Sequence, residues 1–486
     1  MSEAVPAPIG PSAAPPPLPP LPPTRRYDRS LIEGPLQSAV WKMAWPTMLN
    51  NIIGGAQGLV DHILVGRYVG FTGNAAIGVS WQIFLVVVVF IASLFSGMNV
   101  LLARFVGAGD HVSADRTVYM AFLTAIGLSI GVFAPLGYFL SPSLLRLVNA
   151  APEVQAQALP YLRIMFGFSS GMLIFFMLGG ALRSGGDART PLYLGVIATL
   201  LNIALNVILI RGLGPIPAFG TRGSAMGTTI AMGSIALYSL YKLMTGGWVV
   251  AFPPRGQRQI DWGIIRALFK FGLPTGIQGI AMNLGGMMML SFIGSLAVSA
   301  AAQAAFSIGY TQLFSLITWT STGLMGAAAA VAGMNLGAGN PDRAEAAVHA
   351  AARIGAASAT AIGLLFFFFP RQLLAVFGMN DPTVVEIGVQ LLRVLSVSGV
   401  FIAVALTYTG GLQGTGDTKS PLYISVVSQI LVPLGLCVLI RATSRLDPID
   451  IWLAILAGHV TRCALSVIRF NQGKWRAIKV EVPAHR

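Results

Sequence analysis

One acidic side chain lies inside a long apolar stretch near the start of the chain. Residues 48–65 are mostly apolar and contain Asp61, and about 20 apolar residues suffice for a helix to cross a bilayer. A carboxylate at membrane depth costs about 2.5–3.5 kcal/mol or more, so it marks a functional site that faces protein or water. Every other Asp or Glu falls in a tail, a loop or the boundary of an apolar stretch. The type and position of Asp61 therefore predict the binding and release of a cation.

Two further polar residues share a helix face with Asp61. Asn50 and Gln57 precede it by eleven and four residues, which places all three within about 40° of one another on a helix. The adjacent His62 lies about 100° away around the same helix, so a packing role is favoured over a proton relay. An Asp held permanently in a hydrogen bond between helices is the structural alternative to a cation site.

The composition indicates the class of protein that contains this helix. Of 486 residues, 55% are hydrophobic and 10% are charged, against about 25% charged in soluble domains. The formal net charge of +14 comes from Lys and Arg scattered over short loops, which fits membrane topology and anionic lipid better than nucleic acid. Cys437 and Cys463 both lie in apolar stretches and are predicted to be core residues rather than a disulfide or metal pair.

Apolar stretches bounded by Gly, Pro and charge predict an all-α, polytopic membrane protein with twelve transmembrane helices. Lys and Arg are about three times as frequent on the side that holds both termini, so both termini are predicted to be cytoplasmic. The predicted spans are 40–66, 76–102, 117–141, 158–182, 191–211, 222–244, 265–294, 300–333, 346–369, 387–412, 420–441 and 449–470.

A polar stretch near the middle divides the chain into two halves. The predicted domains are a disordered, Pro-rich cytoplasmic tail (1–37), an N-lobe of six helices (38–245), a cytoplasmic linker (246–263), a C-lobe of six helices (264–471) and a cytoplasmic tail (472–486). Boundaries of this kind fall where charge and proline interrupt the apolar pattern.

The two halves repeat one another. Residues 180–193 match 410–423, and residues 107–110 match 337–340, both at an offset of 230. The acidic residue in the first pair of loops is predicted to cap the helix that follows. Six spans per half is an even number, so both copies enter the membrane from the same side. Parallel repeats of this kind predict a transporter with a site between its halves.

These motifs, in this order, resemble the multidrug and toxic compound extrusion (MATE) family. The resemblance covers nearly the whole chain after residue 38. It is carried by Pro46 followed by Asp61, by the doubled Gly-Asp-x-[Arg/Lys]-[Thr/Ser]-Pro loops, and by residues 201–206 followed by 223–228. It implies two six-helix lobes in a V and cation-coupled export of amphiphilic, often cationic, compounds. The coupling ion in known members is H⁺ or Na⁺.

Residue by residue, the resemblance implies a cation site in the N-lobe. Asp61 matches a first-helix acid, and Asn202 and Thr228 match an Asn and a Thr that line the same site in the DinF-type branch. That branch usually has Asp where this chain has Asn206. Asn202 and Asn206 are four residues apart on one helix face, so both amides could reach Asp61 if the helices touch. A single carboxylate is neutralised by one H⁺ or one Na⁺, and H⁺ is favoured.

The other large branch of the family places its acids in the C-lobe. NorM-type members have acids in the seventh and tenth helices, at positions that correspond here to Met282 and approximately Ile402. Both residues are uncharged, so the resemblance is closer to the DinF-type branch.

Substrate contacts are predicted from polar and aromatic side chains within the spans, although core packing explains any one of them as well. We expect a small amphiphilic substrate, the lipid bilayer as surroundings, and no nucleic acid. We also expect a monomer in a bacterial-type inner membrane, with no enzymatic activity, no metal and no cofactor beyond the coupling ion. The candidates are Gln57, Gln82, Gln278, Asn283, Gln303 and Tyr310.

Three other functions are weighed against an exporter. A flippase for a lipid-linked or amphipathic precursor is the principal alternative, and it would favour a basic central cavity. A membrane-embedded transferase would need His and acidic residues clustered at one membrane face, and the spans offer one acid away from their boundaries and three scattered histidines. A channel would need repeated charges along a pore.

Overall fold

The computed structural model describes residues 28–148 and 150–478, and within them the chain is helical apart from its loops. The first half contains α1 (Ser30–Glu33), α2 (Leu36–Tyr68), α3 (Phe71–Gly107), α4 (His111–Leu128), η2 (Ser129–Phe133), α5 (Ala134–Leu147), α6 (Pro152–Gly167), α7 (Ser169–Ser184), α8 (Arg189–Arg211) and α9 (Thr221–Thr245). The second half contains η3 (Arg255–Gln257), α10 (Trp262–Gly294), α11 (Ser299–Phe306), η4 (Ser307–Leu313), α12 (Ser315–Gly337), α13 (Pro341–Phe368), α14 (Pro370–Val376), α15 (Pro382–Gly414), α16 (Lys419–Val426), η5 (Val427–Leu431), α17 (Val432–Thr443), α18 (Pro448–Asn471) and η6 (Lys474–Ala477).

The predicted membrane-protein class is confirmed, and the twelve predicted spans fall on successive helical segments. Nine helices in the described chain are long and apolar enough to cross a membrane, and the bent pair α6–α7, with a 55° angle, makes a tenth. The remaining long helices, α2 and α9, do not reach that hydropathy. Their lower hydropathy has a local reason, because α2 carries Asn50, Gln57 and Asp61 and α9 is rich in Gly, Ser and Thr.

The repeated loops turn the chain from one helix into the next, as predicted. Asp187 Oδ1 accepts hydrogen bonds from the backbone N–H groups of Arg189 and Thr190, both at 3.0 Å, at the start of α8. Asp417 Oδ1 accepts from the N–H of Ser420 at 3.1 Å at the start of α16. Both acids therefore satisfy N–H groups that a helix start leaves without intrahelical partners, and the capping prediction is confirmed.

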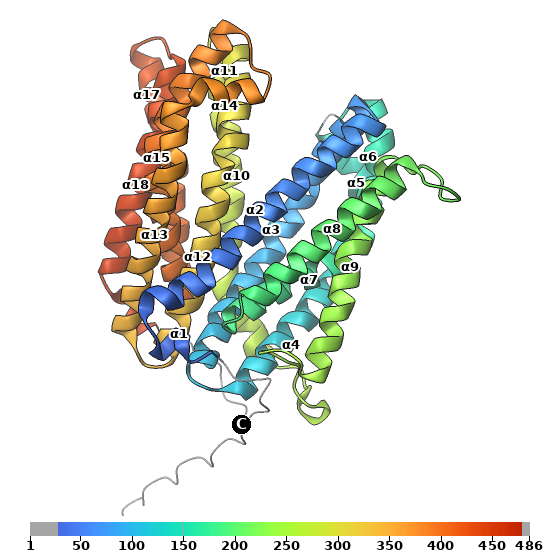
Figure 1. The fold of residues 1–486 in the computed structure, drawn as a ribbon, viewed down its shortest axis with the longest axis vertical. Helices are drawn as coiled ribbons and strands as arrows, with labels where there is room; N and C mark the ends of the chain where they lie inside the picture. Colours follow the sequence, from blue (N-terminus) through green and yellow to red (C-terminus); the bar gives the residue numbers. More distant parts are fainter. Residues whose placement is uncertain (1–27, 149, 479–486) are drawn as a thin grey trace, which may run out of the picture.

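The helices form two bundles that diverge toward the end opposite α1 (Figure 1). α3 packs against α10, and α2 packs against α12. In the repeat, α2 corresponds to α10 and α3 to α12, so the two contacts between the bundles are equivalent. This arrangement is the V of two parallel six-helix repeats that the sequence predicts.

The bundles meet at a pair of glycines that the repeat makes equivalent. A Cβ on Gly107 of α3 would lie 1.9 Å from the carbonyl oxygen of Met334, and a Cβ on Gly337 of α12 would lie 2.2 Å from that of Arg104. Such distances are far inside van der Waals contact, so only glycine allows the two backbones to approach this closely. The pseudo-two-fold axis therefore passes close to these residues, at the end of the V that is closed.

The segment 28–37 corrects the predicted disordered tail, while residues 1–27 lie outside the described part of the chain. Leu31 of α1 is fully buried, and its carbonyl oxygen accepts a hydrogen bond from Asn335 Nδ2 at 3.2 Å. Arg343 Nη2 donates to the carbonyl oxygen of Gly34 at 2.5 Å. The prediction of disorder came from the Pro- and Ala-rich composition of residues 4–23. It does not extend to residue 31, because the Leu31 side chain is buried in the hydrophobic core.

The predicted linker and the C-terminal tail also pack on the bundles where they are described. Phe252, in the linker, is buried and contacts the rings of Tyr119 and Phe122 of α4. In η6, Trp475 is fully buried and stacks on Phe470, with 5.0 Å between ring centroids. Both connections are therefore held against the helices by aromatic contacts.

Candidate functional site

The structure brings Asp61, Asn202, Asn206 and Thr228 together on three adjacent helices of the first bundle. Asn206 Nδ2 donates a hydrogen bond to Asp61 Oδ1 at 2.7 Å. The same nitrogen lies 3.3 Å from Asn202 Oδ1, and Asn202 Nδ2 donates to Thr228 Oγ1 at 3.0 Å. A single chain of hydrogen bonds thus leads from the carboxyl on α2, through both amides on α8, to a hydroxyl on α9.

Close packing of α8 and α9 buries the two amides. Asn202 and Asn206 have no exposed surface, and a Cβ on Gly227 of α9 would lie 2.0 Å from Asn206 Oδ1. The glycine therefore leaves room for the amide beside α9. Asn206 Oδ1 has no hydrogen-bond partner among the described residues, and it is an oxygen available to a proton donor or a cation next to Asp61.

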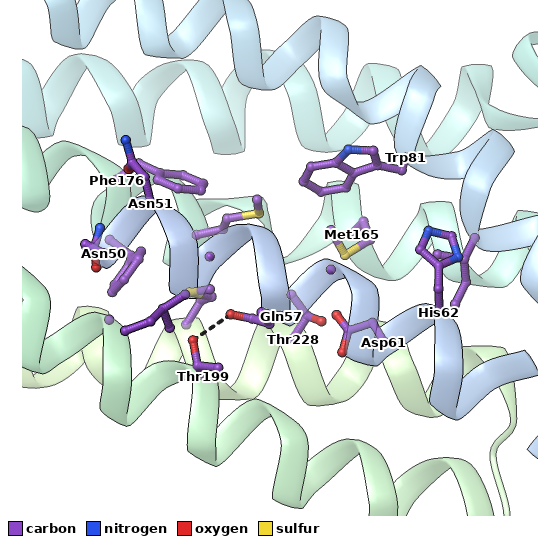
Figure 2. A pocket seen from close by; sticks show the side chains of 18 of the residues that line it. Asn50, Asn51, Gln57, Asp61, His62, Trp81, Met165, Phe176, Thr199 and Thr228 are labelled. Atoms are coloured by element: carbon purple, nitrogen blue, oxygen red, sulfur yellow. Dashed lines mark hydrogen bonds between the residues drawn. The ribbon is translucent and has the colours of Figure 1, made fainter. Parts of the chain in front are cut away.

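Asp61 opens into a cavity of about 390 Å³ between the helices. The polar stripe predicted on α2 lines this cavity, with Asn50, Gln57 and Asp61 in succession along the helix (Figure 2). Gln57 Oε1 accepts a hydrogen bond from Thr199 Oγ1 at 2.9 Å, which fixes the amide against α8. The carboxyl is half-buried. It contacts the buried amide of Asn206 on one side and lines the cavity on the other.

His62 lies on the cavity side of α2 but turns away from the carboxyl. Its Nδ1 forms a hydrogen bond with Asn74 Oδ1 of α3, and Figure 2 shows the ring beyond Asp61. An imidazole held by a hydrogen bond to a neighbouring helix has a structural role. The geometry agrees with the packing role that the sequence favours.

The other substrate-contact candidates lie away from this cavity. Gln278 is buried and bonds to Ser425 Oγ at 2.7 Å, and Tyr310 stacks between Phe306 and Phe314 in the second bundle. Three further candidates are exposed on their helices and line none of the described cavities: Gln82, Asn283 and Gln303. Gln57 is thus the one candidate of the six that the structure brings to the Asp61 cavity.

Several side chains that line the cavity carry too weak a sequence signal to be identified in advance. Apolar and aromatic residues line most of it, including Tyr161, Trp81, Phe175, Phe176, Met165 and Met172. Inside apolar spans such residues look the same as core residues, because the periodicity does not distinguish a packed neighbour from an empty space. Trp319 reaches the cavity from the second bundle, so both lobes contribute to its walls.

Asp61 is the one acid among the described residues that line the cavity. Within the described residues, no group of three or more His, Cys, Asp or Glu side chains could hold a metal ion. The site therefore offers one carboxylate, two amides and one hydroxyl. These groups can hold a proton or a single hard cation and give no geometry for nucleophilic catalysis.

Family comparison identifies the architecture. The model of the MatE family matches residues 46–208 and 274–439, which together cover more than half of the chain. The chain belongs to the MatE family. Members of this family are transporters and not enzymes, and the two matched segments coincide with the two halves of the repeat.

Curated relatives of this MatE chain have similar length. It is 26% identical over 449 residues to a protein named probable multidrug resistance protein NorM of Thermotoga maritima, with 89% of this chain and 92% of the relative covered. It is 26% identical over 446 residues to the multidrug resistance protein MdtK of Edwardsiella ictaluri, with 88% and 94% covered. A solved structure described as an outward-facing MATE family transporter of the MOP superfamily superposes with a TM-score of 0.84, at 22% identity, covering 92% of this chain and 97% of that one.

Replacing Thr228 by Val is expected to destabilise the MatE protein by about 1–3 kcal/mol, because the buried Nδ2 of Asn202 then loses its acceptor. The free energy of unfolding in mixed detergent micelles measures this. Thr229→Val is the matched control, because Thr229 Oγ1 bonds only to carbonyl oxygens of its own helix. Equal stability of the two variants would contradict the hydrogen-bond chain.

Proposed function

We propose that this MatE protein is a proton-coupled antiporter that exports cationic, amphiphilic small molecules by alternating access. The observation that carries the proposal is the hydrogen-bonded Asp61 carboxyl at the wall of the 390 Å³ cavity. A carboxyl at this depth is costly unless it is neutralised or paired. A proton and a cationic substrate can each neutralise it, and they exclude one another.

The exchange follows from this exclusion. With the cavity open to the outside, a proton binds Asp61, and a bound cation loses its counter-charge and leaves. With the cavity open to the cytoplasm, the proton is released and the ionised carboxylate accepts the next cation. The two lobes reorient only when the Asp61 carboxyl is neutralised, either by a proton or by a cationic substrate. Each proton that enters is therefore exchanged for one substrate cation that leaves, and this couples the proton gradient to the substrate gradient.

Hydrogen-bond directions at the site support H⁺ over Na⁺ as the coupling ion. Asn206 presents its amide N–H to Asp61, and the oxygens of Asn202 and Thr228 already accept hydrogen bonds. Na⁺ is a hard ion that takes several oxygen ligands at once. Besides the Asp61 carboxylate, Asn206 Oδ1 is the one oxygen of these three partners that accepts no hydrogen bond from a described residue. That is fewer oxygen ligands than Na⁺ takes, so the site is better suited to a proton.

The cavity wall supports an amphiphilic substrate. Aromatic rings and methionines surround the single carboxylate, among them Trp81, Tyr161 and Met165. Aromatic faces attract organic cations, and flexible thioethers adapt to different shapes. A flat hydrophobic cation is therefore the chemistry that this wall would accept.

Within the family, we place the protein nearer the DinF-type branch. This follows from the cation-site residues Asp61, Asn202 and Thr228 in the first lobe and from the uncharged Met282 and Ile402 in the second. We further propose a monomer in a bacterial-type inner membrane, with both termini in the cytoplasm. The closed end of the V, where α1 lies, is then the cytoplasmic end.

Purified protein in liposomes tests the proposal. An outward proton gradient without Na⁺, with the membrane potential clamped, is expected to drive accumulation of a fluorescent cation such as ethidium inside the vesicles. An outward Na⁺ gradient at equal pH is expected to drive none. Accumulation with Na⁺ alone would replace the ion and keep the site. Flipping of a labelled lipid, with no response of the dye to either gradient, would favour the flippase.

A further inference from the structure

A second cavity lies between the bundles, and it is lined by polar groups from both halves of the repeat. Its volume is about 240 Å³. Arg183 of α7 and Gln413 of α15 both line it, and these two residues are 230 positions apart, as the repeat requires. Thr47 and Thr275, each of which follows the proline of the equivalent helix, also line it. We call this cavity the Arg183 chamber.

The charge in the chamber is uncompensated. No Asp or Glu is among the residues that line it. Arg183 forms no ion pair and no hydrogen bond with any described residue, whereas its repeat counterpart Gln413 donates from Nε2 to Gln278 Oε1 at 3.2 Å. An arginine in the interior without a carboxylate partner is costly, so a guanidinium left open to a cavity indicates an anionic ligand.

Other groups in the chamber fit such a ligand. Asn51 and Asn99 line it together with hydroxyls, including that of Ser96. The amide N–H and hydroxyl groups can add donors to the planar fork of the guanidinium, which binds carboxylates through two parallel hydrogen bonds.

The chamber adjoins the Asp61 cavity. Asn51 lines both, and a smaller cavity of about 100 Å³ is lined by Asn50, Asn51 and Arg183 together. Asn50 and Asn51 therefore border both Arg183 and the Asp61 cavity, and both precede Asp61 on α2.

We propose that the Arg183 chamber binds an anionic group, a carboxylate, carried by the exported amphiphile, so that the preferred substrates are zwitterions with their cationic part at Asp61. This rests on the proposed function and narrows its substrate class. At Asp61, the cationic part of the substrate exchanges with a proton. At Arg183, a free carboxylate on the substrate is distinguished from the uncharged ester group that replaces it.

The test uses one fluorophore in two charge states. Rhodamine B carries a free carboxylate beside its cationic xanthene, and its ethyl ester is a pure cation of nearly the same shape. Binding to the full-length protein in nanodiscs, in a buffer of low ionic strength without added carboxylate and without any gradient, is measured by fluorescence anisotropy. The wild type is expected to bind the acid at least about tenfold more tightly than the ester, as expected for one charge-assisted pair.

Two variants assign this preference to the guanidinium. Arg183→Gln introduces the residue that the repeat has at position 413, and it is expected to bind the acid and the ester equally. Arg183→Lys keeps the charge and is expected to retain part of the preference. Arg189→Gln, at the exposed first residue of α8, is expected to bind both dyes like the wild type.

Two results would overturn the proposal. The first is equal affinity of the wild type for the acid and the ester, whether weak or strong. The second is heat stabilisation by chloride that depends on Arg183, with no preference for the acid, which would assign the chamber to a free anion. Because no gradient is applied, a failure of the carboxylate site is distinct from a failure of coupled export.

Discussion

Replacing Asp61 by Asn is expected to reduce transport driven by a proton gradient by about a hundredfold or more, equivalent to about 2.7 kcal/mol. Asn has almost the shape of a protonated Asp, so the variant resembles a carrier that never releases its proton. The side chain can still bond to Asn206, whose amide has both donor and acceptor atoms. We therefore expect a folded, inserted protein that has lost exchange. Dye accumulation in liposomes under an outward proton gradient measures this.

An exposed acid provides the control for this variant. Glu386 lies near the start of α15 and its side chain is exposed, so Glu386→Gln removes the same charge without touching the cavity. It is expected to transport like the wild type. Proton-driven accumulation that survives in Asp61→Asn, at equal protein content and with a normal unfolding profile, would rule out this carboxyl as the coupling group.

The acid could be predicted from sequence because it has a strong local signal, whereas its partners Asn202 and Thr228 were implied by the resemblance to the MATE family. A carboxylate within an apolar span is rare for an energetic reason, and the spacing of Asn202 and Asn206 places both on one helix face. What the spacing does not give is the order of the hydrogen bonds. Asn206 contacts Asp61 directly, whereas Asn202 bonds to Asn206 and Thr228. That order depends on the rotation of α8 against α2, which is set by packing.

The cavity walls were less predictable, and the reasons differ from one residue to the next. Gln278 and Tyr310 are polar residues within spans that make their contacts inside the second bundle, so polarity alone did not distinguish cavity from core. Arg183 lies just before the repeated loop, and its position near a span boundary suggests an ordinary topological charge. Only the meeting of the two bundles places it in a chamber without an acid.

The repeat indicates which contacts between the two lobes change when the lobes reorient. Both copies of the glycine at positions 107 and 337 lie at the closed end of the V, each against the backbone of the opposite helix. Equivalent contacts on both sides of a pseudo-two-fold axis form or break together. If the lobes exchange between two orientations, these backbone contacts belong to one orientation and are lost in the other.

Gly107→Ala is expected to shift the population away from the conformation described here. The added Cβ would lie 1.9 Å from the carbonyl oxygen of Met334, and backbone that close cannot rotate away as a side chain can. Overpacking of this kind costs about 1–3 kcal/mol, a shift of about 5–150-fold in the ratio of the two orientations. Transport is then expected to fall because one half of the cycle is disfavoured.

Spin labels at the open end would measure the shift directly. Phe71 and Val376 are 85% and 81% exposed and belong to different lobes, so labels on F71C and V376C report the opening of the V. With both native cysteines replaced (C437S and C463S), Gly107→Ala is expected to shorten the mean distance between the labels.

A glycine elsewhere on α3 separates the effect of the contact from that of the added methyl group. A Cβ on Gly78 meets nothing within 4 Å, so Gly78→Ala is expected to leave the label distances unchanged. Gly337→Ala, the equivalent change in the other lobe, should reproduce the effect of Gly107→Ala, since its Cβ would lie 2.2 Å from the carbonyl oxygen of Arg104. Identical distance distributions in all three variants and the wild type would mean that this contact tolerates a methyl group and does not control the orientation of the lobes.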